Sequence, residues 1–305
     1  MLFKQRVESD ELKLVRFLKS RMQLSKDHMN YYRKLEKGFE GEAAFDAHLG
    51  QKLKMECLIL NDLLYEYNNT FFQIDNLLIA KDRLYFNDVK NHEGDYIIEK
   101  GRWYTLDKKE RKDPLLQLDR GESLFRSLLQ ELGVNLPIEG HVIFVNPEFH
   151  LYQAPLNQSI IFPTQINRFI HKLNQTPSNL RTYHTKLAEK LVSLHVKKNP
   201  FTRVPEYSYD QLKKGITCPN CQSFVDLRDR FIVCNKCGCT ENVTKAVTRS
   251  VNEYTLLFPE KKITTNAVHE WCHIIESKST IKRVLQQHFN VISKGRSSYY
   301  VRTGE

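Results

Sequence analysis

Three charged residues in the first half of the chain have types and a spacing that could support hydrolytic chemistry. Asp75 lies in one predicted strand, and Asp88 and Lys90 lie two residues apart in the next. Residues two apart on a strand point to the same face, and a hairpin can bring Asp75 beside them. Two carboxylates are hard ligands for Mg²⁺ or Mn²⁺, and a nearby lysine can stabilise charge growing on a phosphate. Solvated hairpins with weak ion pairs show the same spacing, so spacing alone leaves both interpretations open.

A second group consists of four cysteines in two CxxC pairs, Cys218, Cys221, Cys234 and Cys237. Two thiolates separated by two residues in a tight turn can span one edge of a tetrahedron. We therefore expect a structural Zn²⁺ ion without an open position. Short apolar runs between the pairs predict two strands, which makes this a zinc ribbon. Cys239 is an alternative fourth ligand, which Gly238 directly after Cys237 disfavours.

The acidic residues need a helix and strands to position them. A helix predicted from about residue 31 to residue 49 contains Glu42 next to Gly41, and a glycine permits close backbone approach. Branched and aromatic residues predict strands at 70–80, 83–90 and 96–104, joined as an antiparallel meander. Pro114 opens a helix that Gly133 ends, and residues 141–145 form a buried strand. This order predicts an α/β domain with a mixed sheet.

Five ordered blocks from Lys37 to Val145 resemble the nuclease-related domain family, often called NERD: GFEGE, FFQIDNLLI, FNDVKNHEG, KGRWYT and DPLLQ. The resemblance implies the restriction-endonuclease-like α/β fold and a PD-(D/E)xK type of active site. It makes Glu42 the helix acid, Asp75 and Asp88 the strand acids, and Lys90 the lysine. The family more often has glutamate where this chain has Asp88, although aspartate also suits a metal. Gln117 matches a glutamine that the family places near the site, but an exposed helix residue is a nearly equal interpretation.

The C-terminal segment predicts three helices followed by a hairpin, the arrangement of a winged helix. The predicted DNA-facing side chains are Lys282, Arg283 and Gln286 on the third helix, and Lys294 and Arg296 at the wing tip. A helical packing or dimerisation domain with a solvated face is the alternative. His269 and His273 fit the HExxH pattern, but Trp271 and Cys272 indicate a core helix, so zinc catalysis is not expected there.

Composition and charge point to a globular protein that meets a polyanion. Hydrophobic residues at 41% and charged residues at 27% argue against disorder. The net charge of +10 falls entirely in residues 181–305, which favours contact with nucleic acid, although solubility alone also explains such a charge. Paired cysteines indicate a reducing compartment, so we expect a cytoplasmic protein. The first 18 residues lack the apolar core of a signal peptide, and no apolar run is long enough to span a membrane.

We therefore expect an α/β fold: a restriction-endonuclease-like mixed sheet flanked by helices, a zinc ribbon and an α+β winged-helix-like domain. The expected divisions are a helical segment at 1–36, the nuclease-related domain at 37–195, a linker at 196–214, the ribbon at 215–240 and the winged-helix-like domain at 241–305. The expected function is Mg²⁺- or Mn²⁺-dependent hydrolysis of phosphodiesters in nucleic acid, with DNA the expected substrate. The alternative is a non-catalytic nucleic-acid-binding or regulatory protein that keeps the nuclease fold.

Overall fold

The computed structural model describes residues 1–156, 159–229, 231–292 and 298–302. The chain divides into two compact units, one of residues 1–8 and 34–201, the other of residues 9–33 and 202–305. Helix α2 (Lys26–Lys52) contributes its residues up to Arg33 to the second unit and those from Lys34 to the first. No helix in the described ranges combines the length and apolarity needed to cross a membrane.

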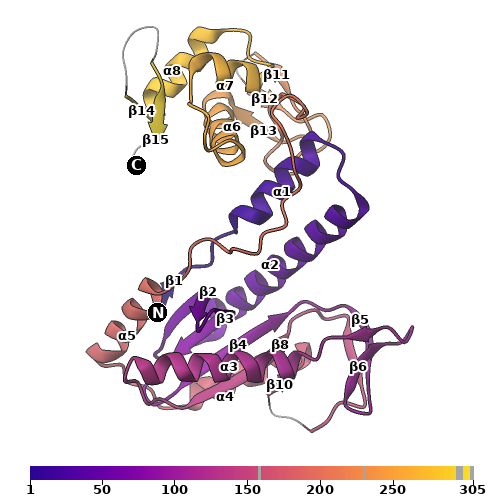
Figure 1. The fold of residues 1–305 in the computed structure, drawn as a ribbon, viewed down its shortest axis with the longest axis vertical. Helices are drawn as coiled ribbons and strands as arrows, with labels where there is room; N and C mark the ends of the chain where they lie inside the picture. Colours follow the sequence, from indigo (N-terminus) through magenta and orange to yellow (C-terminus); the bar gives the residue numbers. More distant parts are fainter. Residues whose placement is uncertain (157–158, 230, 293–297, 303–305) are drawn as a thin grey trace. The chain divides into compact units, whose positions relative to one another are not determined.

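The first unit is built on a mixed sheet with the strand order β1-β2-β3-β4-β8-β10 (Figure 1). Its strands are β1 (Leu2–Lys4), β2 (Leu58–Tyr67), β3 (Thr70–Ile79), β4 (Leu84–Lys90), β8 (Ile138–Phe144) and β10 (Ile160–Ile161). Strands β2, β3 and β4 are antiparallel, while β1, β8 and β10 run parallel to their neighbours. Asn68 and Asn69 turn β2 into β3 with φ of 47° and 58°, as a two-residue hairpin turn requires. The expected mixed α/β architecture is therefore confirmed.

Helices cover both faces of this sheet. Helices α3 (Pro114–Glu131) and α5 (Thr182–Ser193) share one apolar cluster with strands β2, β3 and β4. Helices α2 and α4 (Ile166–Gln175) share a second cluster with Leu78, Tyr85 and Ile143 on the other face. Helix α3 begins at the predicted Pro114, after the N-cap Asp113 accepts a hydrogen bond from the Leu115 N–H. The result is a three-layer arrangement around two apolar cores.

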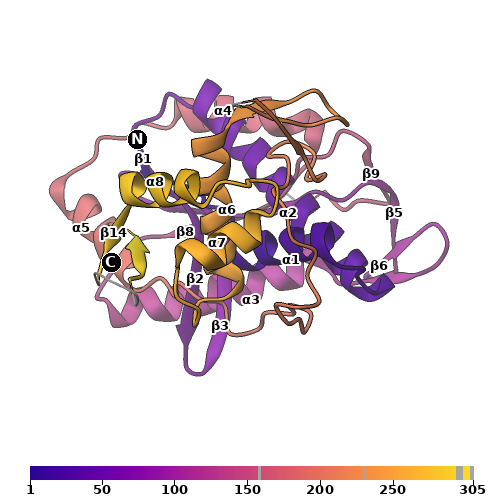
Figure 2. The same cartoon turned by 90° about the horizontal axis from the view of Figure 1, so that it is seen from above.

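A second, smaller sheet has the strand order β7-β6-β5-β9. Its strands are β5 (Gly94–Glu99), β6 (Arg102–Thr105), β7 (Glu110–Arg111) and β9 (Phe149–Tyr152). The predicted third meander strand over 96–104 is wrong. Lys100 and Gly101 form a turn with φ of 48° and 75°, and β4 pairs with β8 instead. Figures 1 and 2 both show β5 and β6 at the end of this unit opposite α5.

The second unit combines helices and short strands. The helices are α1 (Asp10–Arg21), α6 (Val243–Leu257), α7 (Thr265–Cys272) and α8 (Lys278–His288). The strands are β11 (Asp226–Arg228), β12 (Phe231–Val233), β13 (Thr240–Asn242), β14 (Phe289–Val291) and β15 (Tyr300–Arg302). Strands β11, β12 and β13 form an antiparallel sheet, and β14 pairs antiparallel with β15. Cys218 and Ile232 share one apolar cluster with Val247 and Val284, so the ribbon and the helices have a common core.

Two contacts join α1 and the segment 202–214 to this second unit. Arg21 is bonded to both carboxylate oxygens of Glu253 on α6, at 2.6 and 2.9 Å, and these side chains are 0% and 1% exposed. Leu212 is buried against Leu18 and Tyr254. The expected linker is therefore packed against helices over this part. The expected domain boundaries, and the assignment of α6, α7, α8 and the β14–β15 pair as a winged helix, stay predictions.

Candidate active site

Three aspartates lie in one row across the central strands of the first unit. Asp62 and Asp75 occupy facing positions between the paired residues Asn61–Asn76 and Leu63–Ile74 of β2 and β3. Asp75 and Asp88 are the next residues beyond Asn76 and Asn87, the pair at which the regular pairing of β3 with β4 ends. The Val89 N–H donates to Asp75 Oδ2 at 2.8 Å. The sheet therefore presents carboxylates at the point where its regular ladder is interrupted.

The β2 strand changes its side-chain alternation at Asp62. Leu58 and Leu60 before it, and Leu63 and Tyr65 after it, all belong to the same apolar core. Strict alternation would send one of these pairs to the opposite face. Asp62 absorbs the shift with a φ of 53°, a conformation that aspartate tolerates better than most residues.

Lys90 and Gln117 both reach the carboxylate of Asp88. The Lys90 ammonium lies 2.7 Å from Asp88 Oδ2 and 2.8 Å from Oδ1. The Gln117 amide on α3 donates to Asp88 Oδ1 at 3.4 Å. A cavity of about 190 Å³ opens beside them, with apolar walls that include Phe72, Leu118 and Leu124. Space is thus available for a ligand next to the buried carboxylate.

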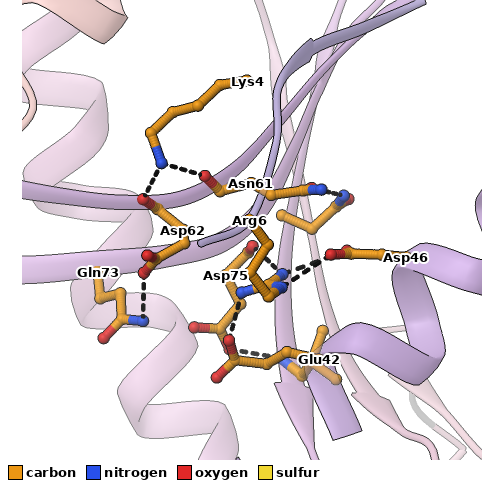
Figure 3. A network of polar contacts seen from close by, with 10 residues as sticks. Lys4, Arg6, Glu42, Asp46, Asn61, Asp62, Gln73 and Asp75 are labelled. Atoms are coloured by element: carbon orange, nitrogen blue, oxygen red, sulfur yellow. Dashed lines mark hydrogen bonds and ion pairs between the residues drawn. The ribbon is translucent and has the colours of Figure 1, made fainter. Parts of the chain in front are cut away.

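Glu42 reaches the centre from helix α2, where Arg6 holds it (Figure 3). The Arg6 guanidinium pairs with Glu42 Oε2, bonds both carboxylate oxygens of Asp46, and donates to the Asp75 carbonyl oxygen at 2.7 Å. Glu42 and Asp46 lie one helical turn apart, so a single planar guanidinium can contact both. Arg6 thus contacts Glu42 and the backbone of Asp75, while Lys90 contacts Asp88. Among the described residues, Glu42, Asp75 and Asp88 do not form a set of three ligand atoms within 4.8 Å of one another, so their shared role in one site stays a prediction.

Electrostatics indicate more buried negative charge than the two cations offset. Burial raises the pKa of Asp88 to about 7, with Lys90 lowering it and Asp75 raising it further. Burial and the charge of Asp75 raise the pKa of Glu42 to about 9, against the opposing effect of Arg6. Burial also raises the pKa of Asp75. Burial alone would lower the pKa of Lys90, but Asp88 and Asp75 outweigh it. Carboxylates are hard oxygen donors, so Asp75 and Asp88 are the residues here that could hold a divalent cation.

Helix α2 approaches the sheet closely at Gly41. A Cβ atom built there would lie 2.4 Å from the Cβ of Asn91, which is too close for any side chain. The Asn91 amide donates to the Lys37 carbonyl of α2 at 2.7 Å and accepts from Asn146 at 3.1 Å. Asn91, directly after Lys90, therefore joins the end of β4 to the helix that carries Glu42.

The sequence reasoning missed several residues of this centre: Arg6, Asp46, Asp62 and a buried asparagine row. In that row Asn76 donates to Asn61 at 2.7 Å, and Asn87 donates to Asn76 at 2.8 Å. Buried amides bonded across three strands fix their register, because a slip would leave them unpaired. A signal existed: each asparagine adjoins an aspartate, as Asn61-Asp62, Asp75-Asn76 and Asn87-Asp88.

The four predicted cysteines gather in the second unit. Their sulfur atoms all lie within 4.8 Å of one another, with Cys218–Cys237 at 3.6 Å and Cys221–Cys234 at 3.4 Å. Four thiolates about 2.3 Å from a shared Zn²⁺ ion would be spaced similarly. Among the described residues this is the one set of three or more ligand atoms so closely gathered, and Cys239 is outside it. The cysteines are therefore positioned to bind a metal, as expected for a structural zinc site.

Three of the five residues predicted to face DNA lie in described parts of the chain. Lys282, Arg283 and Gln286 are exposed on α8, while Lys294 and Arg296 lie outside the described residues. His269 bonds the Glu276 carbonyl, and neither it nor His273 belongs to a metal-binding group within the described ranges.

The region around the acidic centre matches a known protein family. Residues 37–145 match the family model described as the nuclease-related domain, NERD. This range contains Glu42, Asp75, Asp88, Lys90 and Gln117 but not Arg6. No curated protein and no solved structure matches the chain.

Proposed function

We propose that this protein is a metal-dependent nuclease that hydrolyses phosphodiester bonds, with DNA as substrate, because residues 37–145 match the nuclease-related domain model. One observation carries the proposal. Asp75 and Asp88 lie on neighbouring strands directly beyond the paired residues Asn76 and Asn87, and Lys90 is paired with Asp88 beside an open cavity. A structural ion-pair network would not require a cavity at its buried carboxylates.

Asp75 and Asp88 are the proposed ligands of Mg²⁺ or Mn²⁺. Both are buried, both have raised pKa values, and both offer carboxylate oxygens on the same row of the sheet. A bound divalent cation lowers the pKa of water and neutralises charge on a phosphate.

The remaining side chains have roles that follow from their positions. Lys90 supplies positive charge that stabilises the phosphate oxygens as their charge increases. Gln117, at the rim of the cavity, orients water or phosphate through its amide. Glu42 has one oxygen engaged by Arg6, and its other oxygen is available to a water molecule.

The second unit is the proposed nucleic-acid holder. Lys282, Arg283 and Gln286 are exposed on α8, and the positive charge of the chain is concentrated in residues 181–305. Zinc held by the four cysteines stabilises the fold of this unit and takes no part in hydrolysis. Reduced thiolates are compatible with a cytoplasmic location.

The test is a cleavage assay on labelled single- and double-stranded DNA and RNA, with and without Mn²⁺. Asp88→Asn and Lys90→Ala should each lower the cleavage rate about a hundredfold or more. Asp82→Asn is the matched control, because Asp82 is an exposed aspartate on the adjoining turn. Equal cleavage by all three variants and the wild type would refute the assignment. Binding of nucleic acid by the wild type without Mn²⁺-dependent cleavage would favour the non-catalytic alternative.

A further inference from the structure

Residues 1–8 lie outside the matched nuclease-related range but inside the first unit. Strand β1 pairs parallel with β2, and the Lys4 ammonium donates to the Asn61 and Asp62 carbonyl oxygens, each at 2.7 Å. These bonds fasten β1 beside the point where β2 changes its alternation. Arg6, two residues after Lys4, lies in the acidic centre.

Arg6 is more buried, and makes more hydrogen bonds, than an ordinary surface cation. Its side chain is 5% exposed, and its three nitrogen atoms make four bonds to Glu42, Asp46 and the Asp75 backbone. One flat group thereby connects two acids of helix α2 to the strand that carries Asp75 (Figure 3). A lysine could not reproduce this pattern, because an ammonium is a compact point charge without the planar fork.

The charges around the centre divide into two sets. Arg6 is bonded to Glu42 and Asp46, while Lys90 is paired with Asp88 and acts on Asp75. Asp62 and Lys4 are the other charged groups that act on the two sets. Arg6 bonds the Asp75 backbone, and its charge opposes the rise that burial causes in the pKa of Asp75, but the carboxylate partners of Arg6 are Glu42 and Asp46. Asp88, whose carboxylate is paired with Lys90, lines the cavity.

We propose that Arg6 is a positioning residue of the active site, which makes the N-terminal strand part of the catalytic unit. It holds Glu42 beside Asp75 and withholds Glu42 and Asp46 from direct metal ligation, so that Asp75 and Asp88 bind a single divalent cation. The inference rests on the proposed nuclease function and names a residue and a metal stoichiometry that the function alone does not require.

The experiment uses the full chain with zinc bound and measures Mn²⁺ binding by titration calorimetry and by electron paramagnetic resonance. The wild type should bind one Mn²⁺. Arg6→Ala should weaken this affinity about tenfold to a hundredfold, because Arg6 donates to the backbone carbonyl of Asp75 and so orients a proposed metal ligand. Addition of methylguanidinium should restore binding and cleavage to Arg6→Ala by tenfold or more, because it fills the vacated position. Arg6→Lys should remain impaired.

Three further variants keep the inference testable even if Arg6→Ala folds poorly. Asp46→Asn weakens the Arg6 anchor while leaving the guanidinium, and should reduce Mn²⁺ affinity less than Arg6→Ala does. Glu42→Gln should retain one bound Mn²⁺ within a few-fold of the wild-type affinity. Arg83→Ala removes a half-exposed arginine of the same sheet and should change nothing.

The outcomes separate the two proposals. Two Mn²⁺ ions in the wild type, or a loss in Arg6→Ala that methylguanidinium does not restore, would overturn the role of Arg6. One Mn²⁺ ion with the expected Arg6 dependence but no cleavage of nucleic acid would support Arg6 and refute the nuclease function. A wild type that binds no Mn²⁺ would refute both.

Discussion

The acidic centre and the cysteine cluster assemble their ligands in different ways. All four cysteines lie between Cys218 and Cys237, in two turns joined by one short hairpin. The acidic centre draws on the segment after β1 and on α2, β3 and β4, so that Arg6 and Asp88 come from parts of the chain far apart in sequence. The cysteine cluster therefore depends on local turn geometry, whereas the acidic centre depends on the whole sheet being formed.

The two centres also differ in how their charge is held. The cysteine sulfur atoms contact one another, Cys218 with Cys237 and Cys221 with Cys234, so a metal ion would stabilise the set directly. In the acidic centre, Arg6 and Lys90 already neutralise part of the charge, yet burial still raises the pKa values of Glu42 and Asp88. The comparison teaches that four sulfur atoms gathered in one centre offer a complete set of ligands for one metal ion, while in the other centre the buried carboxylate Asp88 keeps a raised pKa beside a cavity.

The largest expected effect follows from loss of the zinc site. Cys234→Ser should release the metal and lower the unfolding temperature of the second unit by about 10 °C or more, because structural zinc contributes folding free energy. Cys218 and Cys234 are part of that unit's core, so the loss should spread to its helices. Metal analysis and scanning calorimetry measure both effects.

Cys239→Ser is the matched control for this variant. Cys239 lies outside the gathered set, so this variant should keep its zinc and its unfolding temperature. Mn²⁺ binding by the first unit should survive in Cys234→Ser, since the two centres belong to separate cores. Equal loss of zinc from both variants would mean that the fourth ligand is wrongly assigned.

The next largest effect concerns the approach of helix α2 to the acidic centre. Gly41→Ala forces a Cβ against the Cβ of Asn91, and neither atom can swing away as the end of a flexible side chain could. We expect a cost of about 1–3 kcal/mol in the free energy of unfolding. Displacement of the adjoining Glu42 should also lower cleavage about tenfold to a hundredfold. Urea unfolding and the cleavage assay measure these two effects.

Gly38→Ala provides an internal control one turn earlier on the same helix. No atom lies within 4 Å of a Cβ built at Gly38, so the substitution should only improve helix propensity. We expect stability to rise by up to about 1 kcal/mol, with unchanged cleavage. If both variants behave alike, close approach at Gly41 does not position Glu42.

The contrast between the centres also explains what the sequence could predict. The CxxC pairs, the Pro114 helix start and the buried strand predicted over residues 141–145 are determined by neighbouring residues. Each is present in the structure, the strand as β8 from Ile138 to Phe144. The separate β5–β6 sheet was missed because pairing partners depend on distant strands, not on strand propensity. Arg6 was missed for the same reason: nothing near it in sequence indicates that β1 joins β2.

A smaller effect should appear in the pH dependence of the first unit. Burial, together with Lys90, Arg111 and Lys37, lowers the pKa of His92 to about 4, and its ring stacks on Tyr96. A histidine whose folded-state pKa is depressed stabilises the fold fully above its unfolded pKa of about 6.5. That contribution is lost as pH falls from about 6.5 towards 4.

For His92 we expect a loss of about 2 kcal/mol over this window, reduced from the full shift because the ring is partly exposed. His92→Phe keeps the aromatic packing and removes the titration, so its unfolding free energy should depend less on pH. Urea unfolding at several pH values between 7.5 and 4.5 measures the difference. Parallel curves for the two proteins would exclude His92 as the source.

The smallest effect per substitution should come from the exposed basic face of α8. Lys282→Ala and Arg283→Ala should each weaken nucleic-acid binding only a few-fold, and each should reduce the salt dependence of log K by about 0.9 if its side chain contacts a phosphate. Lys186→Ala, an exposed lysine on α5 of the first unit, is the control and should leave both quantities unchanged. Fluorescence anisotropy from 50 to 200 mM salt measures the slope. If Lys186→Ala alters the slope and the α8 variants do not, nucleic acid is bound by the first unit. That result would refute the proposal that the second unit binds it.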